Sequence, residues 1–277
     1  MTQSRTVLIT GATDGLGQAL AHRLAADGDT TLLLHGRDQR RLDATADAIQ
    51  AAHGGARPET FRADLAELAQ VRTLAAAVRA ATDRLDVLVS NAGVGGGEPD
   101  GRDRRVSRDG YELRFAVNYL AGFLLTHELL PLLLASAPAR VVNVASLGQQ
   151  DIDFDDVMLE RDYDGMRAYC QSKLAQISSA VELAERIPAA KVTFNSLHPA
   201  TFMPTKMVLQ EIGHSIDSLE TGVEATRRLI VDPKLDGVSG RFYDRQREAK
   251  ALPQAYDEKA RAELYRRSVD WVGLPNN

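Results

Sequence analysis

Residues 6–17 read TVLITGATDGLG, an apolar run followed by three closely spaced glycines. The apolar run, Thr6–Thr10, is continuous, as expected for a strand buried on both faces of a parallel sheet. Leucines then recur on one stripe over residues 16–26, which predicts a helix there. A strand, a tight glycine turn and a helix in this order let a pyrophosphate approach the backbone at the helix N-terminus. The stretch therefore predicts an α/β fold with a dinucleotide site.

Apolar runs and helical patterns alternate along the rest of the chain. Further strands are predicted at residues 30–34, 60–63, 86–90, 141–145, 191–197 and 240–244. Further helices are predicted at residues 39–52, 67–82, 110–135, 219–231 and 254–271. One more helix carries Tyr169 and Lys173 and ends at about residue 186. This alternation is typical of a doubly wound, three-layer sandwich. No repeat or linker interrupts it, so we expect one domain over residues 1–277.

Composition excludes several classes of protein. The 277 residues carry a formal net charge of −5 and show no basic block of the kind that binds nucleic acid. The single cysteine, Cys170, rules out an internal disulfide and suits a reducing, cytoplasmic compartment. No signal peptide is evident, and the longest apolar run, 120–135, is broken by His127, Glu128 and Pro131. We therefore expect no membrane span, and we expect no metal.

The end of the second strand bears on the choice of dinucleotide. Here the sequence reads His-Gly-Arg-Asp, about 20 residues beyond the glycine turn, where an acid favours NAD and an arginine favours NADP. Gly36 carries no carboxylate to repel a phosphate, and Arg37 offers a charged fork that suits one. We therefore favour NADP(H); the alternative uses Asp38 as the ribose-binding acid. Asp14 is an acid inside the turn, near the expected phosphates, and the residues alone suggest a turn or helix-capping role for it.

Polar or small residues also follow the other strands, at the edge of the sheet where ligands bind. Asp64 follows the strand at 60–63 and is either an adenine contact or a helix N-cap. Asn91-Ala92-Gly93 ends the next strand, and Ser146 follows the strand at 141–145, where it can hydrogen-bond a substrate oxygen. Asn118 lies inside a helix, so it is either a structural staple or a site residue, because a buried amide needs partners.

Tyr169 and Lys173 lie four residues apart, which places both on one face of a helix. A phenol has an ordinary pKa of about 10 and is a poor acid near neutral pH. Two charges roughly 4 Å apart interact by about 4 kcal/mol at an effective dielectric of about 20, enough to lower the phenol pKa by up to roughly three. Tyr169 then exchanges protons with a carbonyl or an alcohol.

Three segments before and after the helix of Tyr169 and Lys173 differ in composition from the strands and helices. Residues 149–167 are acidic and resemble an insert. His198 next to Pro199 is more consistent with a structural role. Residues 200–218 contain loosely spaced apolar side chains, which suggests a lid over an apolar substrate; an ordinary packed helix is the alternative.

Taken together, these motifs resemble the short-chain dehydrogenase/reductase family. The residues that carry the resemblance are Thr10, Gly11, Gly15, Gly17, Asn91, Ala92, Gly93, Asn118, Ser146, Tyr169 and Lys173, in the family's order. The His-Gly-Arg-Asp stretch, the acidic insert and Val238–Phe242 look like the branch that contains retinol dehydrogenases and protochlorophyllide reductases.

The resemblance implies a Rossmann fold with a seven-stranded parallel sheet, and a role for each matching residue. It implies Tyr169 as general acid/base, Lys173 as the group that lowers its pKa and binds the nicotinamide ribose, Ser146 as the group that orients the carbonyl, and Asn118 as the holder of a relay water. It implies that NADP(H) contacts Gly11, Thr13, Asp14, Gly15, Leu16, Gly17, Arg37, Asp64, Leu65, Asn91, Ala92, Gly93, Pro199 and a following threonine.

The chain departs from the family after the sixth strand. The usual Pro-Gly is Pro199-Ala200 here, and the threonine that follows is displaced. Thr201 and Thr205 are both candidates for the contact with the nicotinamide amide.

The main hypothesis is an NADPH-dependent carbonyl reductase or alcohol dehydrogenase acting on a moderately apolar small molecule. A carbon–carbon double-bond reductase is a second reading, because a Tyr-Lys pair can deliver the proton in the reduction of a double bond as well as of a carbonyl. A non-catalytic NADPH sensor or scaffold is a third, which the intact Ser, Tyr and Lys disfavour. A homodimer through the long helices carrying Asn118 and Tyr169 is compatible with the resemblance, although the branch includes monomers.

Overall fold

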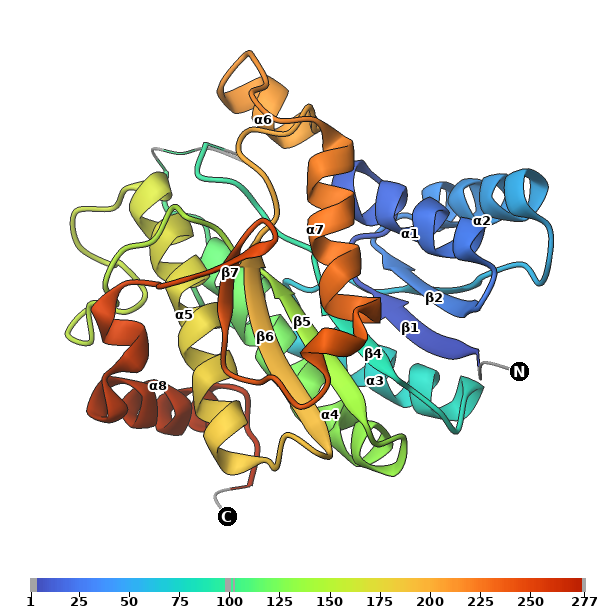
Figure 1. Ribbon diagram of the computed structural model, residues 1–277. Helices are drawn as coiled ribbons and strands as arrows, with labels where there is room; N and C mark the ends of the chain where they lie inside the picture. The colour runs from blue at the N-terminus through green and yellow to red at the C-terminus, as the bar shows by residue number, and fades with distance from the viewer. Residues whose placement is uncertain (1–3, 98–100, 102, 276–277) are drawn as a thin grey trace.

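The computed structural model describes residues 4–97, 101 and 103–275, which build one sheet with helices on both faces (Figure 1). The strands are β1 (Arg5–Ile9), β2 (Thr30–Gly36), β3 (Glu59–Arg62), β4 (Val87–Ser90), β5 (Ala139–Val144), β6 (Val192–His198), β7 (Phe242–Asp244) and β8 (Arg247–Ala249). Their spatial order is β3-β2-β1-β4-β5-β6-β7-β8. The chain reverses its direction of travel across the sheet between β1 and β4, which is where open α/β sheets bind ligands.

The longer connecting helices match the predicted ones to within a few residues, with two exceptions, and the structure adds two short helices over residues 206–211 and 233–235. They are α1 (Gly15–Asp27), α2 (Gln39–His53), α3 (Leu68–Ala81), η1 (Phe115–Leu120), α4 (Ala121–Ala135), α5 (Gly165–Arg186), α6 (Lys206–Glu211), α7 (Leu219–Val231), η2 (Pro233–Leu235), η3 (Pro253–Tyr256) and α8 (Glu258–Trp271). The predicted helix 110–135 contains the π-helical turn η1. The predicted helix 254–271 is split, because Asp257 caps α8 by accepting a hydrogen bond from Ala260 N.

The α/β prediction is confirmed, and the strand count needs one correction. Strands β1 to β7 are parallel, but an eighth strand, β8, pairs antiparallel with β7. Only two residues, Arg245 and Gln246, separate these strands, and a turn that short can join only antiparallel neighbours. The residues of β8 are Arg, Glu and Ala, without the apolar pattern by which the other strands were recognised.

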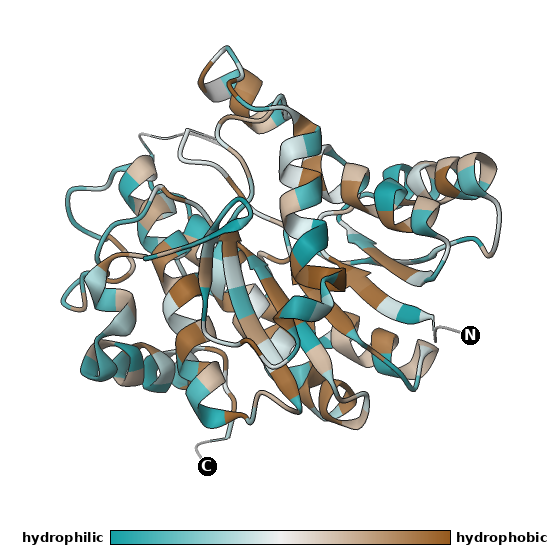
Figure 2. Cartoon of the chain, in the orientation of Figure 1, coloured by the Kyte–Doolittle hydropathy of each residue, from teal (hydrophilic) through white to brown (hydrophobic). Residues whose placement is uncertain are grey.

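Two apolar clusters, one on each face, hold the helices on the sheet. Val7, Ile9 and Leu34 face α1, α2 and α7, whereas their neighbours Leu8 and Leu33 face α3, α4 and α5. Alternation along a strand sends successive side chains to opposite faces, so a strand covered on both sides is apolar throughout. Figure 2 shows this pattern, with hydrophobic residues along the central strands and hydrophilic ones on the outer turns of α8.

One helix in the described part of the chain, Phe115–Ala135, is long and apolar enough to cross a membrane by length and composition alone. It comprises η1 and α4, and 56% of its most apolar window is buried inside the fold. Leu120, Leu124 and Leu129 are fully buried in the cluster on the α3–α4–α5 face. Packing against the sheet therefore accounts for its apolar composition.

The C-terminal helix α8 covers the outer side of α5 and η1. The Tyr119 and Ser268 hydroxyls are 2.7 Å apart, and the Arg186 guanidinium lies 3.9 Å from the centre of the Tyr265 ring. Arg261 is buried and donates to Glu182 at 3.3 Å. These contacts hold α8 against the helices that it covers.

A buried ionic group fastens the loop after β4. The side chain of Arg114 is fully buried and donates to the carbonyls of Gly95 at 2.7 Å and Gly96 at 2.9 Å. It also donates to the Tyr163 hydroxyl at 2.6 Å, which in turn donates to Glu112 at 2.9 Å. The group thus joins the loop after β4 to the acidic segment before α5. Residues 98–100 and 102, further along the same loop, lie outside the described residues.

We predict that Arg114→Leu lowers the free energy of unfolding by about 3–5 kcal/mol, because it leaves the Glu112 carboxylate buried without its cation. Arg108→Leu is the matched control, since the ion pair of Arg108 with Glu67 lies at the surface and contributes less than about 1 kcal/mol. Urea denaturation of both variants measures the difference. Equal, small losses would show that the buried group is not a major support of the fold.

Candidate active site

The glycine turn between β1 and α1 has the backbone form that its sequence predicts. Gly11 and Gly15 have φ of 66° and 49°, a region that favours glycine. A methyl group on Gly17 would lie 2.3 Å from the Gly11 carbonyl oxygen, so only glycine allows the helix to start this close to the strand. The amide of Asn91 donates to the Thr10 carbonyl at 2.9 Å and the Gly11 carbonyl at 3.3 Å. Asn91 therefore ties the turn to the end of β4.

Asp14 has a clear structural role. Its carboxylate caps α1 by accepting from Gly15 N at 2.7 Å, and it accepts from the Arg41 guanidinium at 2.8 Å. Arg41 also donates to the carbonyl of Thr13 at 3.1 Å. The hydrogen bond with Arg41 is the largest cause of a lowered pKa at Asp14. Sequence reasoning missed Arg41, which reaches the turn from the first part of α2.

The residues after β2 divide between structural and exposed positions. Asp38 caps α2 by accepting from Arg41 N at 3.1 Å, whereas Arg37 is exposed. His35 is buried beneath the glycine turn; Gly11 N donates to its Nδ1 at 3.3 Å, and its Nε2 is 3.1 Å from the Ala63 carbonyl. Burial lowers the pKa of His35 to about 4, so the ring is neutral near pH 7.

The edge beside β3 holds Asp64 and the buried Leu65. Asp64 accepts from Ala66 N at 3.0 Å, two residues ahead, and so shapes the turn that leads to α3. The residue at the N-cap position of α3 is Glu67, whose side chain makes no capping bond. The helix-capping alternative for Asp64 is therefore wrong in detail, although the side chain does stabilise the backbone before the helix.

Tyr169 and Lys173 lie one turn apart on α5, and the Lys173 Nζ is 5.6 Å from the centre of the Tyr169 ring. The ammonium donates to the Val144 carbonyl at 2.9 Å and to the Gln176 side chain at 3.0 Å. Lys173 is 5% exposed, and burial lowers its pKa to about 7. Gln176 was not identified from the sequence, although three residues after a lysine is a position on the same helix face.

Ser146 lies just beyond β5 and faces the same space as Tyr169. Its Oγ accepts from Gly148 N at 2.9 Å. A methyl group on Gly148 would lie 3.4 Å from the Ser146 Oγ and 3.7 Å from the Tyr169 ring. The two side chains therefore border one space beside Gly148.

Asn118 sits in η1, where the backbone departs from the regular α-helical pattern. Its Oδ1 accepts from Val94 N at 2.7 Å, and its Nδ2 donates to the Val94 carbonyl and to the Ser172 Oγ. A methyl group on Gly93 would lie 3.3 Å from the Asn118 Oδ1 and 3.7 Å from the Lys173 Nζ. Asn118 is thus a structural staple of the site, and Gly93 leaves room beside Lys173.

The segment after β6 places its two threonines differently. The Thr201 hydroxyl is 3.1 Å from both the His198 Nε2 and the Arg245 guanidinium. Thr205 caps α6 and lies against the glycine turn, since a methyl group on Gly15 would be 3.0 Å from its Cγ2. Pro199 and the buried Ala200 link these contacts to β6.

The comparisons with known proteins agree with this geometry. Residues 5–212 match the sequence model of the short chain dehydrogenase family. The chain is 34% identical to human retinol dehydrogenase 13 over 288 residues, covering 98% of this chain and 85% of that protein. It is 35% identical to human retinol dehydrogenase 14 over 303 residues, covering 98% and 87%.

Solved structures are similar throughout the fold. An uncharacterised protein of Mycobacterium paratuberculosis has a TM-score of 0.75 and 26% identity, covering 98% of this chain and 94% of that one. A short chain dehydrogenase of Escherichia coli CFT073 complexed with NADPH has a TM-score of 0.69 and 25% identity, covering 88% and 97%. The chain is therefore an oxidoreductase that belongs to the short-chain dehydrogenase/reductase family, in its retinol dehydrogenase-like branch.

Proposed function

We propose that this protein is an NADP(H)-dependent oxidoreductase that interconverts a carbonyl and an alcohol on a moderately apolar small molecule. The observation that carries the proposal is the shared space bordered by Ser146 and Tyr169, with Lys173 one turn away. The glycine turn and the room beside Gly93 suit the dinucleotide that the family uses. When bound, NADP(H) supplies or accepts the hydride.

Tyr169 is the proposed proton donor to the carbonyl oxygen during reduction and the acceptor of the same proton during oxidation. Ser146 supports this assignment. Gly148 N already occupies one lone pair of its oxygen, so its own O–H can donate to a substrate oxygen and stabilise growing negative charge. Reduction of a double bond ends with the proton on carbon, whereas reduction of a carbonyl ends with the proton on oxygen, so a serine and a tyrosine that both donate to one oxygen favour the carbonyl reaction over that alternative.

Lys173 orients and charges the site. An ammonium has three N–H donors, and two of them go to Val144 and Gln176. The third is proposed to bind the nicotinamide ribose, and the charge over the ring favours negative charge on the phenol oxygen. Because the Asn118 amide is bound to Val94 and Ser172, a relay water is better held by the Asn118 backbone carbonyl than by its side chain.

The preference for NADP(H) rests on the residues after β2. Asp38 serves as the α2 cap, which disfavours the ribose-binding acid of an NAD site. Arg37 is exposed beside it, and Arg41 brings a second guanidinium to the glycine turn. Similar solved structures include complexes with NADP and NADPH. We propose Arg37 as the principal contact of the 2′-phosphate and Thr205, rather than Thr201, as the threonine that meets the cofactor.

Residues 200–218 are the proposed substrate lid. Phe202, Leu209 and Ile216 expose 39%, 48% and 62% of their surface, although large apolar side chains are usually buried. An apolar substrate would cover such side chains. The similar proteins named for retinol, an apolar alcohol, support the same class of substrate.

The homodimer remains a prediction. Because α8 lies over α5, a second copy would have to bind on α8 or elsewhere. A dimer formed directly between two α5 helices is therefore not what we propose.

Tyr169→Phe removes the proton donor, and we expect kcat for carbonyl reduction to fall by about 10²–10⁴-fold. Binding of NADPH should change little, because the ring and Lys173 remain. The test follows loss of reduced nicotinamide absorbance with a panel of aldehydes, ketones and enones, and product analysis separates carbonyl from double-bond reduction. Unchanged turnover would refute the assignment of Tyr169, and tight NADPH binding without turnover on any substrate would favour the sensor.

Arg37→Ala should weaken NADPH binding by roughly 10-fold or more, because it removes a charged partner of the 2′-phosphate, while NADH binding changes little. Fluorescence titration gives the ratio of the dissociation constants of variant and wild type for NADPH and for NADH. Arg40→Ala, an exposed arginine three residues further on, is the control. Equal losses for NADPH and NADH would refute the contact.

Burial of Lys173 predicts a particular pH dependence of stability. With a folded pKa of about 7 and an ordinary value of 10.5, the unfolded chain holds more protons between these two pH values. Burial of this group therefore costs most stability below pH 7, where the lysine must be buried with its charge. The free energy of unfolding rises as the pH increases from 7 to 10.5, because the cost disappears over that range. Urea denaturation should show that Lys173→Met is more stable relative to the wild type at pH 6 than at pH 10, by up to about 4 kcal/mol. A pH-independent difference would contradict the buried ammonium.

A further inference from the structure

The lid is closed at its base by a short paired neck, formed by Thr201 and Phe202 on one side and Ile216 and Asp217 on the other. Ile216 N donates to the Phe202 carbonyl, and Asp217 N donates to the Thr201 carbonyl, both at 3.0 Å. In return, Thr201 N donates to the Asp217 carboxylate at 2.7 Å. Residues 203–215 are thus a loop whose two ends are held together.

One side chain from a distant part of the chain clamps this neck. Arg245, in the turn between β7 and β8, donates to the Asp217 carboxylate from Nη2 at 2.5 Å and from Nε at 3.1 Å. It also donates to the Thr201 hydroxyl at 3.1 Å. Its backbone N donates to the His198 carbonyl at 2.7 Å, so it also contacts the end of β6.

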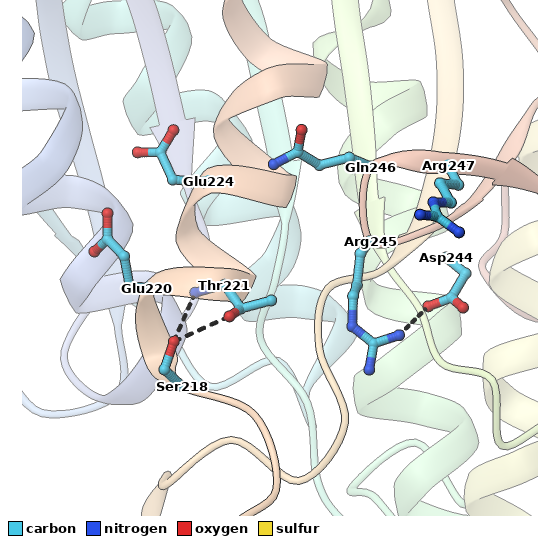
Figure 3. A pocket seen from close by; sticks show the side chains of 8 residues that line it. All are labelled: Ser218, Glu220, Thr221, Glu224, Asp244, Arg245, Gln246 and Arg247. Carbon is cyan, nitrogen blue, oxygen red and sulfur yellow. Dashed lines mark hydrogen bonds and ion pairs between the residues drawn. The ribbon is translucent and has the colours of Figure 1, made fainter.

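Figure 3 shows Arg245 beside a hollow between the β7–β8 turn and the first turn of α7, with a bond to Asp244. Asp217 lies just before that helix, which begins at Leu219. Because the guanidinium is planar and presents several donors at once, it can bind the carboxylate of Asp217 and the hydroxyl of Thr201 together. Lysine, with a single ammonium, would not hold both in the same geometry.

The backbone conformation of Arg245 is one that favours glycine, which indicates that the arginine side chain has a role in this turn. Its φ is 53°, a left-handed conformation that glycine adopts without strain and arginine does not. The guanidinium contacts with Asp217 and Thr201 help to offset this strain. The same fact offers a clean experiment, since glycine at this position removes the clamp and relieves the backbone.

The clamped lid rests on the glycine turn. Thr205 lies against Gly15, and a methyl group on Gly222 would meet the Met203 sulfur, which packs between α7 and Leu16. The loop that Arg245 holds at its base therefore reaches the turn that receives the cofactor phosphates. Loosening the neck would free these contacts together.

We propose that Arg245 is a positioning residue that clamps the neck of the lid, keeps residues 203–215 seated on the glycine turn and so slows the release of NADP(H). The slower release of NADP(H) rests on the proposed function, whereas the clamp on the neck does not. Arg245 acts through Asp217 and Thr201 and has no part in the proton transfer.

Limited proteolysis tests the clamp without any ligand. Lys206 is the only lysine or arginine between residues 202 and 217, so trypsin cleavage of the lid gives fragments 1–206 and 207–277. Cleavage of a transiently opened loop follows the population of its open form. Arg245→Gly should be cut at Lys206 about tenfold faster than the wild type, because it loses charge-assisted hydrogen bonds. Arg245→Lys should fall between the two.

Arg247→Gly is the matched control, because it places a glycine in the same hairpin and removes an arginine that lines the same hollow (Figure 3). Its cleavage rate should stay within about twofold of the wild type, since Arg247 is outside the neck contacts. Unchanged urea midpoints establish that the variants are folded. Equal cleavage of Arg245→Gly and wild type would overturn the clamp.

A separate experiment measures the release of the cofactor. Stopped-flow displacement of NADPH should show release about tenfold faster in Arg245→Gly, with a higher KM for NADPH and no fall in kcat. Faster cleavage with unchanged NADPH release would leave the clamp and overturn its role in cofactor retention. A wild-type protein that does not bind NADPH would overturn the proposed function and that role, while the cleavage rates still decide the clamp.

Discussion

The buried ammonium of Lys173 is the interaction on which the arrangement of the site depends. Removing an ammonium from water is costly, and two acceptors, the Val144 carbonyl and the Gln176 amide, hold it at the end of β5. The bond to Val144 fixes α5 against the carboxyl edge of the sheet, whereas Gln176 lies on α5 itself. Tyr169 is carried to its position beside Ser146 by the same helix, so the burial cost at Lys173 is linked to the geometry of the site.

Polar side chains that are buried or partly buried also hold the loops at this edge. Asn91 binds the glycine turn, Asn118 binds Val94, and Arg114 binds the carbonyls of Gly95 and Gly96. Loops carry function because they are free to vary, but a site needs them in one position. Polar groups buried beneath the loops provide that rigidity, because each bond replaces a partner in water that burial removes.

The Tyr-Lys pair shows how far local reasoning reaches. The four-residue spacing correctly placed both side chains on one face of a helix. It did not show that Nζ would bond to the Val144 carbonyl, because that contact depends on how α5 packs on β5. Arg41, His35 and Arg245 were missed for a similar reason: each meets partners at least 24 residues away in sequence, and no local pattern indicates such a contact.

The sequence by itself determined the α/β fold, the glycine turn, the order of the first seven strands along the chain and the residues that gather at the sheet edge. These follow from local periodicity and backbone preference, which act over a few residues. Only the tertiary structure decided that Arg41 reaches the glycine turn, that Arg114 binds the loop after β4, and that Arg245 binds Asp217 and Thr201. These depend on contacts between distant segments, whose free energy exists only once the chain has folded around them.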